Sequence, residues 1–67
     1  MQLLISIITP CYNAVPFIAQ TIESVLAQTY PYWEMLIVDD CSTDRSAEII
    51  QTYVKRDSRI KYFKISD

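Results

Sequence analysis

The run MLIVDDCSTD, residues 35–44, organises the rest of this chain. Four apolar residues in succession predict a β-strand that is buried on both faces, and the polar cluster after them is typical of the start of a helix. Asp39 and Asp40 therefore lie at the carboxyl end of a strand, immediately before a helix. Open α/β sheets bind their ligands at this edge. We expect the two carboxylates to form part of a ligand site.

The segments before this run predict a strand and a helix. Residues 3–9 are β-branched and almost wholly apolar without helical periodicity, which indicates a central parallel strand. Pro10 is expected to end that strand, because proline has no backbone N–H to donate. Apolar side chains then recur at helical spacing across residues 16–28, and residues 33–38 form the second strand.

The segments after this run predict a second helix and a third strand. The helix begins near Thr43 or Asp44, whose side chains can accept hydrogen bonds from free amides of a first turn. Residues 59–65 alternate between the two faces of a more exposed strand. The order strand-helix-strand-helix-strand predicts an α/β fold, a Rossmann-like parallel sheet with right-handed crossovers and helices packed on its faces.

Length and composition restrict the class of protein. The chain has 67 residues, with six Lys and Arg against eight Asp and Glu, and half of it is apolar. A chain of this size can form a core but buries only about 60% of its unfolded surface, so we expect it to be part of a larger domain. Basic residues crowd only the last third, at Lys55, Arg56, Arg59, Lys61 and Lys64. A solvated helix end and an edge strand blunted by lysines explain them better than a phosphate site, and we expect no nucleic-acid partner.

Residue types also favour a location and exclude some chemistry. We expect no membrane segment and no signal peptide, because no apolar run approaches the roughly 20 residues of a membrane span and no cleavage signal is visible. Cys11 and Cys41 without an export signal indicate reduced thiols in a cytoplasmic protein. The chain contains no histidine and no glycine. Neither His-based chemistry nor a glycine-rich phosphate loop is therefore expected within it.

Two loops are expected to meet at the carboxyl edge, residues 9–13 and residues 39–42. They offer an aromatic ring, hydroxyls, a carboxamide and two carboxylates, which suit a planar ligand such as a nucleoside. Tyr12 could stack on a base or could simply lie on the first helix, and Asn13 could be only a turn residue or a helix cap. Neighbouring residues of a strand point opposite ways, so one acid of the pair is expected to serve backbone amides while the other faces the ligand.

Three ordered motifs make the sequence recognisable. They are SIITPCYN at residues 6–13, IESVLAQTY at residues 22–30, and WE at residues 33–34 leading into IVDDCSTD at residues 37–44. Together they closely resemble the start of family 2 inverting glycosyltransferases, over essentially the whole chain. The resemblance implies the A-type glycosyltransferase fold, in which a nucleotide-binding α/β half joins an acceptor-binding half. It also implies transfer of a sugar from a nucleotide-diphosphate donor to an acceptor with inversion.

By position, the resemblance implies four nucleotide-binding residues. Pro10 and Tyr12 match the loop that packs around the base and ribose. Asp40 matches the contact to the base, usually uracil, and Asp39 matches its partner, which we expect to support the loop more than the ligand. The family often has glycine where Cys41 stands, and a residue other than glycine resists a positive φ.

The resemblance places the catalytic centre outside this sequence. The family's Asp-x-Asp motif for Mg²⁺ or Mn²⁺ lies beyond Asp67, and its catalytic base lies further still. No catalytic residue and no metal ligand can be assigned within residues 1–67, which we interpret as the N-terminal nucleotide-recognition part of a glycosyltransferase domain, inactive by itself. The implied partners are a nucleotide-sugar donor, with UDP as the expected nucleotide, and a sugar, lipid or protein acceptor, as in polysaccharide biosynthesis.

Two interpretations from other classes stay open at this point. A receiver-like signalling domain also carries paired acids on a parallel sheet, but its pair follows the first strand, whereas Asp39 and Asp40 follow the second. The chain could instead act as an interaction module. An unpaired sheet edge and exposed apolar surface would then promote self-association.

Overall fold

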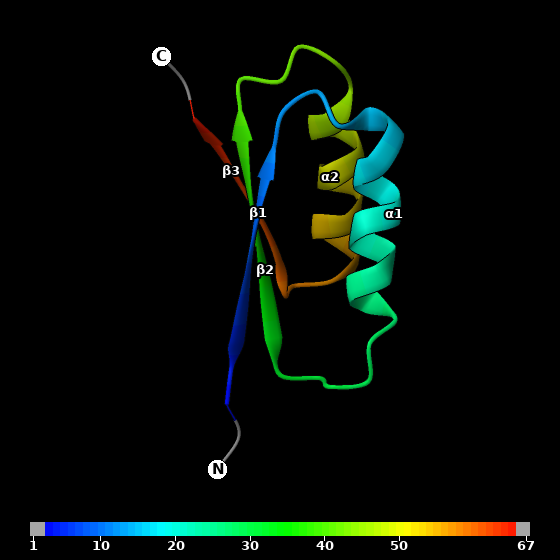
Figure 1. Cartoon of the computed structure of the whole chain (residues 1–67), viewed down its shortest axis with the longest axis vertical. Coiled ribbons are helices and arrows are strands. Elements are labelled where there is room, and N and C mark those ends of the chain that lie inside the picture. Colours follow the sequence, from blue (N-terminus) through cyan, green and yellow to red (C-terminus); the bar gives the residue numbers. More distant parts are fainter. Residues whose placement is uncertain (1–2, 66–67) are drawn as a thin grey trace.

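A computed structural model describes residues 3–65 of the chain as one sheet flanked by helices (Figure 1). The elements are β1 (Ile5–Cys11), α1 (Val15–Leu26), β2 (Trp33–Asp40), α2 (Ser46–Arg56) and β3 (Ile60–Ile65). The three strands are parallel and lie in the order β1-β2-β3. The predicted α/β class and the predicted order of elements are confirmed.

Both helices lie on the same face of the sheet (Figure 1). The strand order advances across the sheet in one direction, so successive crossovers of one hand bring both helices to one side. The expectation that helices would cover both faces is therefore wrong for the described residues. The opposite face, called the open face below, carries the apolar side chains of Ile8, Leu36, Val38, Phe63 and Ile65.

The hydrophobic core lies between the sheet and the helices. It contains Cys11, Ile18, Ile22, Trp33, Met35, Ile37, Ile50, Tyr53 and Ile60. Along β2 the side chains alternate between buried positions, which face the helices, and half-buried positions, which face the other way. This alternation corrects the prediction that β2 is buried on both faces, because only one side of the sheet carries helices in residues 3–65.

The first strand differs from its prediction in its bounds and in its place in the sheet. β1 continues to Cys11, and Pro10 lies inside it opposite Val38 instead of ending it. Within residues 3–65, β1 is an edge strand, and β2 is the strand with two neighbours. An edge strand tolerates proline, because a donor that faces away from the neighbouring strand is not needed for pairing.

The helices begin and end close to their predicted bounds, with two instructive differences. The first residue of α2 is Ser46, later than Thr43 or Asp44, because the residues before it are bound to the loop after β1, as described below. Phe17, one of the apolar residues in the predicted helix 16–28, does not join its buried face and exposes 66% of its surface. The alternation of β3 is as predicted, with Ile60 buried and Phe63 exposed. Neither helix of residues 3–65 combines the length and apolar character required to span a membrane.

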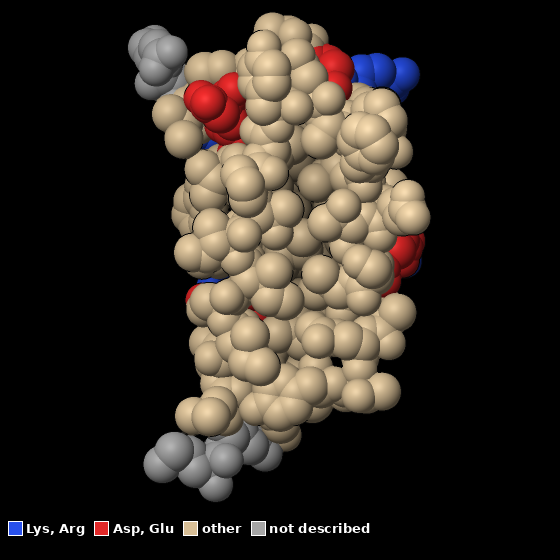
Figure 2. Space-filling view, viewed as in Figure 1, with Lys and Arg blue, Asp and Glu red and all other residues tan. Residues whose placement is uncertain are grey.

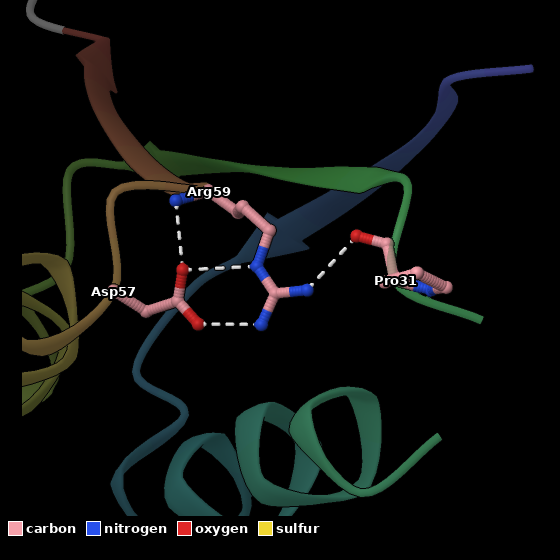
Figure 3. A network of polar contacts seen from close by, with 3 residues as sticks. All are labelled: Pro31, Asp57 and Arg59. Carbon is pink, nitrogen blue, oxygen red and sulfur yellow. Dashed lines mark hydrogen bonds and ion pairs between the residues drawn. The ribbon is translucent and has the colours of Figure 1, made fainter. Parts of the chain in front are cut away.

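The basic residue Arg59 holds the amino end of the sheet together (Figure 3). Its Nε and Nη2 atoms donate to the two carboxylate oxygens of Asp57 at 3.0 and 2.7 Å, and Nη1 donates to the carbonyl oxygen of Pro31 at 3.0 Å. The guanidinium also lies 3.9 Å from the centre of the buried Trp33 ring. The hydrogen bonds from Arg59 lower the pKa of Asp57 despite its partial burial. Arg59 is thus engaged in the fold at this end.

Candidate functional site

The carboxyl ends of β1 and β2 lie side by side, since Cys11 is paired with Asp39. The loops that follow them, residues 12–14 (the first loop) and residues 41–45 (the second loop), meet at this end of the sheet (Figure 1). Figure 2 shows acidic side chains near this end and a largely uncharged flank below it. The expected convergence of the two loops is therefore observed.

Asp39 is buried and supports the second loop. Only 1% of it is exposed. One carboxylate oxygen accepts a hydrogen bond from the backbone N–H of Ser42 at 3.0 Å, and the other accepts one from the hydroxyl of Tyr62. Burial opposes ionisation, but the hydrogen bonds from Ser42 and Tyr62 outweigh it and lower the pKa of Asp39. Burial and the neighbouring carboxylate raise the pKa of Tyr62 to about 12.

Asp40 and Tyr12 face outward from the same edge. Strand alternation turns Asp40 to the side opposite Asp39, and it is exposed. Tyr12 follows the end of β1 and exposes 63% of its surface, so most of it is not packed against the first helix. Pro10 is also exposed, and it is paired with Val38 one residue before the end of β1. The paired acids thus divide into one buried support and one exposed group.

The second loop caps the start of α1. Ala14, the residue before the helix, makes no side-chain cap of its own. Instead, the backbone N–H of Ala14 donates to the hydroxyl of Ser46 at 2.9 Å, and that of Val15 donates to a carboxylate oxygen of Asp44 at 3.2 Å. Asp44 also accepts from the N–H and the hydroxyl of Ser46. Free amides of a first helical turn are normally satisfied by a local cap, and here a distant segment supplies it.

Asn13 makes the reciprocal connection. Its side-chain oxygen accepts from the backbone N–H of Thr43 at 2.7 Å, from the Thr43 hydroxyl at 3.3 Å and from the backbone N–H of Asp44 at 3.2 Å. Its own backbone N–H donates to the hydroxyl of Ser42 at 3.0 Å. Asn13 has φ of 46°, a left-handed conformation that asparagine tolerates better than most residues. It is a turn residue, as one interpretation expected, and it also caps amides about 30 residues away, which no local pattern reveals.

Cys41 occupies the position where the resembling family often has glycine. Its φ is 57°, so this residue adopts the left-handed conformation that resists a β-carbon. Its thiol donates to the carbonyl oxygen of Ile65 at 2.9 Å. The loop therefore keeps a glycine-like shape with a cysteine in it. Cys11 is buried and Cys41 is half-buried, and neither forms a disulfide within residues 3–65.

Two other features of the described residues bear on ligand binding. A hollow of about 410 Å³ lies beside the helices and is lined by Val15, Arg45, Glu48, Ile49 and Thr52. It includes none of the four residues expected to bind nucleotide. In residues 3–65, no three His, Cys, Asp or Glu side chains gather in a way that could hold a metal ion.

Comparison with known proteins assigns this architecture. Residues 6–66 match the family model described as Glycosyl transferase family 2. The chain belongs to this family. The family assignment sets aside the receiver-like interpretation and agrees with the three motifs on which the resemblance was based.

Relatives in the family are named as glycosyltransferases. TuaG of Bacillus subtilis (strain 168), assigned to teichuronic acid biosynthesis, is 58% identical over 57 residues, which cover 85% of this chain and 23% of TuaG. Glycosyltransferase GlyG of Streptococcus pneumoniae serotype 4 is 39% identical over 61 residues, which cover 91% of this chain and 20% of GlyG. The chain spans about a fifth of the length of these two relatives.

Solved structures share the same arrangement of strands and helices, that of A-type glycosyltransferases. Residues 1–349 of S. aureus TarS superpose with a TM-score of 0.83 at 31% identity, covering 98% of this chain and 19% of TarS. A complex of the same protein with UDP gives a TM-score of 0.80 at 29% identity, with the same coverage. The mannosyltransferase PcManGT of Pyrobaculum calidifontis, solved with GDP-Man and Mn²⁺, shares the fold with a TM-score of 0.76 at 24% identity, covering 91% of this chain and 18% of PcManGT.

Proposed function

We propose that residues 1–67 supply base and ribose recognition in an enzyme that transfers a sugar from a UDP-sugar to an acceptor with inversion. The observation that carries this proposal is the pair of exposed groups, Tyr12 and Asp40, at the carboxyl edge of two neighbouring strands. Ligands of open α/β sheets bind at that edge. Membership of the family and the UDP complex of TarS support the choice of nucleotide.

Each proposed contact follows from the exposure of its residue. The Tyr12 ring can stack on the base, with Pro10 beside it. The Asp40 carboxylate can accept a hydrogen bond from a base N–H, which is worth about 1.5–3 kcal/mol for a charged acceptor. Asp39 cannot serve the ligand in the same way, because both of its oxygens already accept hydrogen bonds from Ser42 and Tyr62. Its proposed part in nucleotide binding is to fix the loop.

A divalent cation is proposed for the whole enzyme, as Mg²⁺ or Mn²⁺. The support is the family and the Mn²⁺ in the PcManGT structure. The described residues do not fit a metal: Asp39 is committed to the loop, and within residues 3–65 Asp40 belongs to no group of three His, Cys, Asp or Glu side chains that could hold an ion. A cation would therefore be held by residues that lie beyond Asp67, together with the catalytic base.

The acceptor and the location are proposed more broadly. The similarity to TuaG supports an acceptor in bacterial polysaccharide biosynthesis. A cytoplasmic location stays a prediction that rests on the two cysteines, Cys11 and Cys41.

An amide-resolved NMR titration of the chain with UDP, with and without Mn²⁺, tests the proposal. We expect shifts centred on Tyr12 and Asp40, with little added effect of Mn²⁺. The substitution Asp40→Ala should raise the dissociation constant for UDP by roughly 10- to 100-fold, the equivalent of the lost charged hydrogen bond. The matched control is Asp57→Ala at the opposite end of the sheet. Equal UDP affinity for Asp40→Ala and the unsubstituted chain would contradict the assignment.

A second proposal concerns self-association, which the open face favours. Ile8, Phe63 and Ile65 expose 67%, 51% and 46% of their surfaces on that face. Exposed apolar patches of this kind commonly bind another protein surface. Sedimentation at increasing concentration tests it: the mass of the chain should rise with concentration, and Phe63→Lys should reduce the rise. A constant monomer mass would contradict this proposal without affecting nucleotide recognition.

A further inference from the structure

We infer that Asn13 is a positioning residue that fixes Tyr12 relative to Asp40 and thereby sets the affinity of the site for the nucleotide. The inference rests on the proposed function. It concerns a cluster here called the loop clamp, which consists of Asn13, Ser42, Thr43 and Asp44.

The first step of the argument is the position of the clamp between the two exposed groups. Asn13 is the neighbour of Tyr12 in the first loop, and Thr43 follows Asp40 by three residues in the second. Asn13 is bonded to this second loop through its side-chain oxygen, at Thr43 and Asp44, and through its backbone N–H, at Ser42. It therefore links the segment that carries the ring to the segment that carries the carboxylate at several neighbouring positions.

The second step is that the hydrogen bonds of the clamp run in both directions between the two loops. The Asn13 oxygen accepts from the second loop, while the Asn13 N–H donates to the Ser42 hydroxyl in that same loop. Ser42 is itself anchored, because its N–H donates to the buried Asp39. The first loop is thus tied through Ser42 to a carboxylate that cannot move without disturbing β2.

The third step is that the sheet supports the two exposed groups unequally. The backbone of Asp40 is paired with Ile65 in the sheet, whereas Tyr12 lies just after the end of β1, and packing holds neither exposed side chain. When a binding-competent arrangement is populated only a fraction of the time, the apparent dissociation constant rises by the inverse of that fraction. Loops that keep their mutual arrangement about a tenth of the time would bind nucleotide about tenfold more weakly.

Two substitutions of Asn13 separate its side chain from its backbone. Asn13→Gly keeps the positive φ without strain but removes the acceptor. Asn13→Asp keeps an acceptor oxygen for Thr43 and Asp44. The control is Asp57→Ala, which breaks hydrogen bonds at the opposite end of the sheet. UDP and uridine are titrated into each chain by NMR, and hydrogen exchange is measured at the amides of Thr43 and Asp44.

We expect Asn13→Gly to raise the dissociation constants for UDP and for uridine by the same factor, about tenfold. Exchange at Thr43 and Asp44 should be faster in Asn13→Gly. For Asn13→Asp we expect rescue, with uridine affinity within about threefold of the unsubstituted chain, since the acceptor is kept. Asp57→Ala should leave both affinities unchanged while lowering stability, which distinguishes positioning from a general loss of structure.

The other outcomes would contradict the inference about Asn13, the proposed function, or both. If Asn13→Gly weakens UDP but not uridine, Asn13 contacts the diphosphate directly and is not a positioning residue. If the unsubstituted chain binds UDP and Asn13→Gly binds it equally well, the inference fails and the proposed function stands. If the unsubstituted chain binds neither ligand, both fail together. Should Asn13→Gly not fold, Ser42→Ala takes its place, and an unchanged UDP affinity there overturns the inference.

Discussion

The two ends of the sheet are held together by different means. At the amino end, a single side chain fixes the geometry: Arg59 forms a short ion pair with Asp57, donates to the carbonyl oxygen of Pro31 and lies over the buried Trp33 ring. At the carboxyl end, loops about 30 residues apart exchange hydrogen bonds between side chains and backbone amides, with Asn13 and Cys41 in left-handed conformations.

The difference separates a structural end from the end at which we propose that the nucleotide binds. At the amino end, the charged and aromatic side chains contact one another. The carboxyl end satisfies its backbone amides with side chains and leaves Tyr12 and Asp40 exposed. Substitutions at the amino end should therefore change stability alone, and substitutions at the carboxyl end should change both stability and nucleotide binding.

The largest effect is expected at Asp39. Asp39→Ala leaves the Ser42 N–H and the Tyr62 hydroxyl without their acceptor, and each unsatisfied buried group costs about 1–3 kcal/mol. We expect urea unfolding to show a loss of about 3 kcal/mol together with weaker UDP binding. Asp39→Asn, which keeps one acceptor, should lose less. A loss equal to that of an ordinary surface substitution would show that Asp39 does not organise this end.

A smaller effect is expected at the opposite end. Asp57→Ala removes the carboxylate that accepts from Nε and Nη2 of Arg59, and we expect urea unfolding to show a loss of about 1 kcal/mol. The amide shifts of Asn13 and Thr43 should not move. The control Glu48→Ala breaks an exposed ion pair on α2 and should be nearly silent. Movement of the loop amides in Asp57→Ala would mean that the two ends are coupled.

The two ends should respond alike to acid and differently to alkali. The pKa values of Asp39 and Asp57 are lowered in the folded chain, so their stabilisation is complete above the unfolded value near 4 and is lost as the pH falls through the lower folded values. Both ends therefore weaken in acid. Asp39→Asn and Asp57→Asn should each flatten the acid unfolding curve. An unchanged curve in both variants would contradict these shifts.

In alkali the carboxyl end should weaken through Tyr62. Its pKa is raised to about 12, so the stabilisation is complete below the ordinary value near 10 and is lost as the pH rises toward 12. Tyr62→Phe should remove this part of the alkaline transition and leave the acid branch that depends on Asp57. Equal alkaline unfolding of Tyr62→Phe and the unsubstituted chain would show that the tyrosine does not titrate with the fold.

The smallest effect is expected at Cys41. Cys41→Gly relieves the left-handed backbone but loses the hydrogen bond to Ile65 and adds chain entropy to the unfolded state. We expect a net gain of only a few tenths of a kcal/mol in thermal unfolding, because these contributions nearly cancel. Cys41→Ala, which keeps the β-carbon and loses the thiol, should be slightly destabilising. A large loss in Cys41→Gly would assign the thiol a greater structural part.

Several features of the site were predictable from adjacent residues, and others were not. The apolar run before Asp39 and Asp40 predicted a strand whose end carries two acids of opposite orientation, and the structure shows one buried and one exposed. The late start of α2 and the role of Asn13 were not predictable. They depend on hydrogen bonds between loops about 30 residues apart, which no local pattern in the sequence records.

The sequence by itself determined the order of the elements, the α/β class and the positions of Tyr12, Asp39 and Asp40 at strand ends, because periodicity and turn residues act locally. Only the tertiary structure decided that β1 lies at an edge, that both helices share one face and that Pro10 stays inside its strand. These depend on the order of the strands in space. Strand order is set by which surfaces pack together, and that choice is made by residues far apart in the chain.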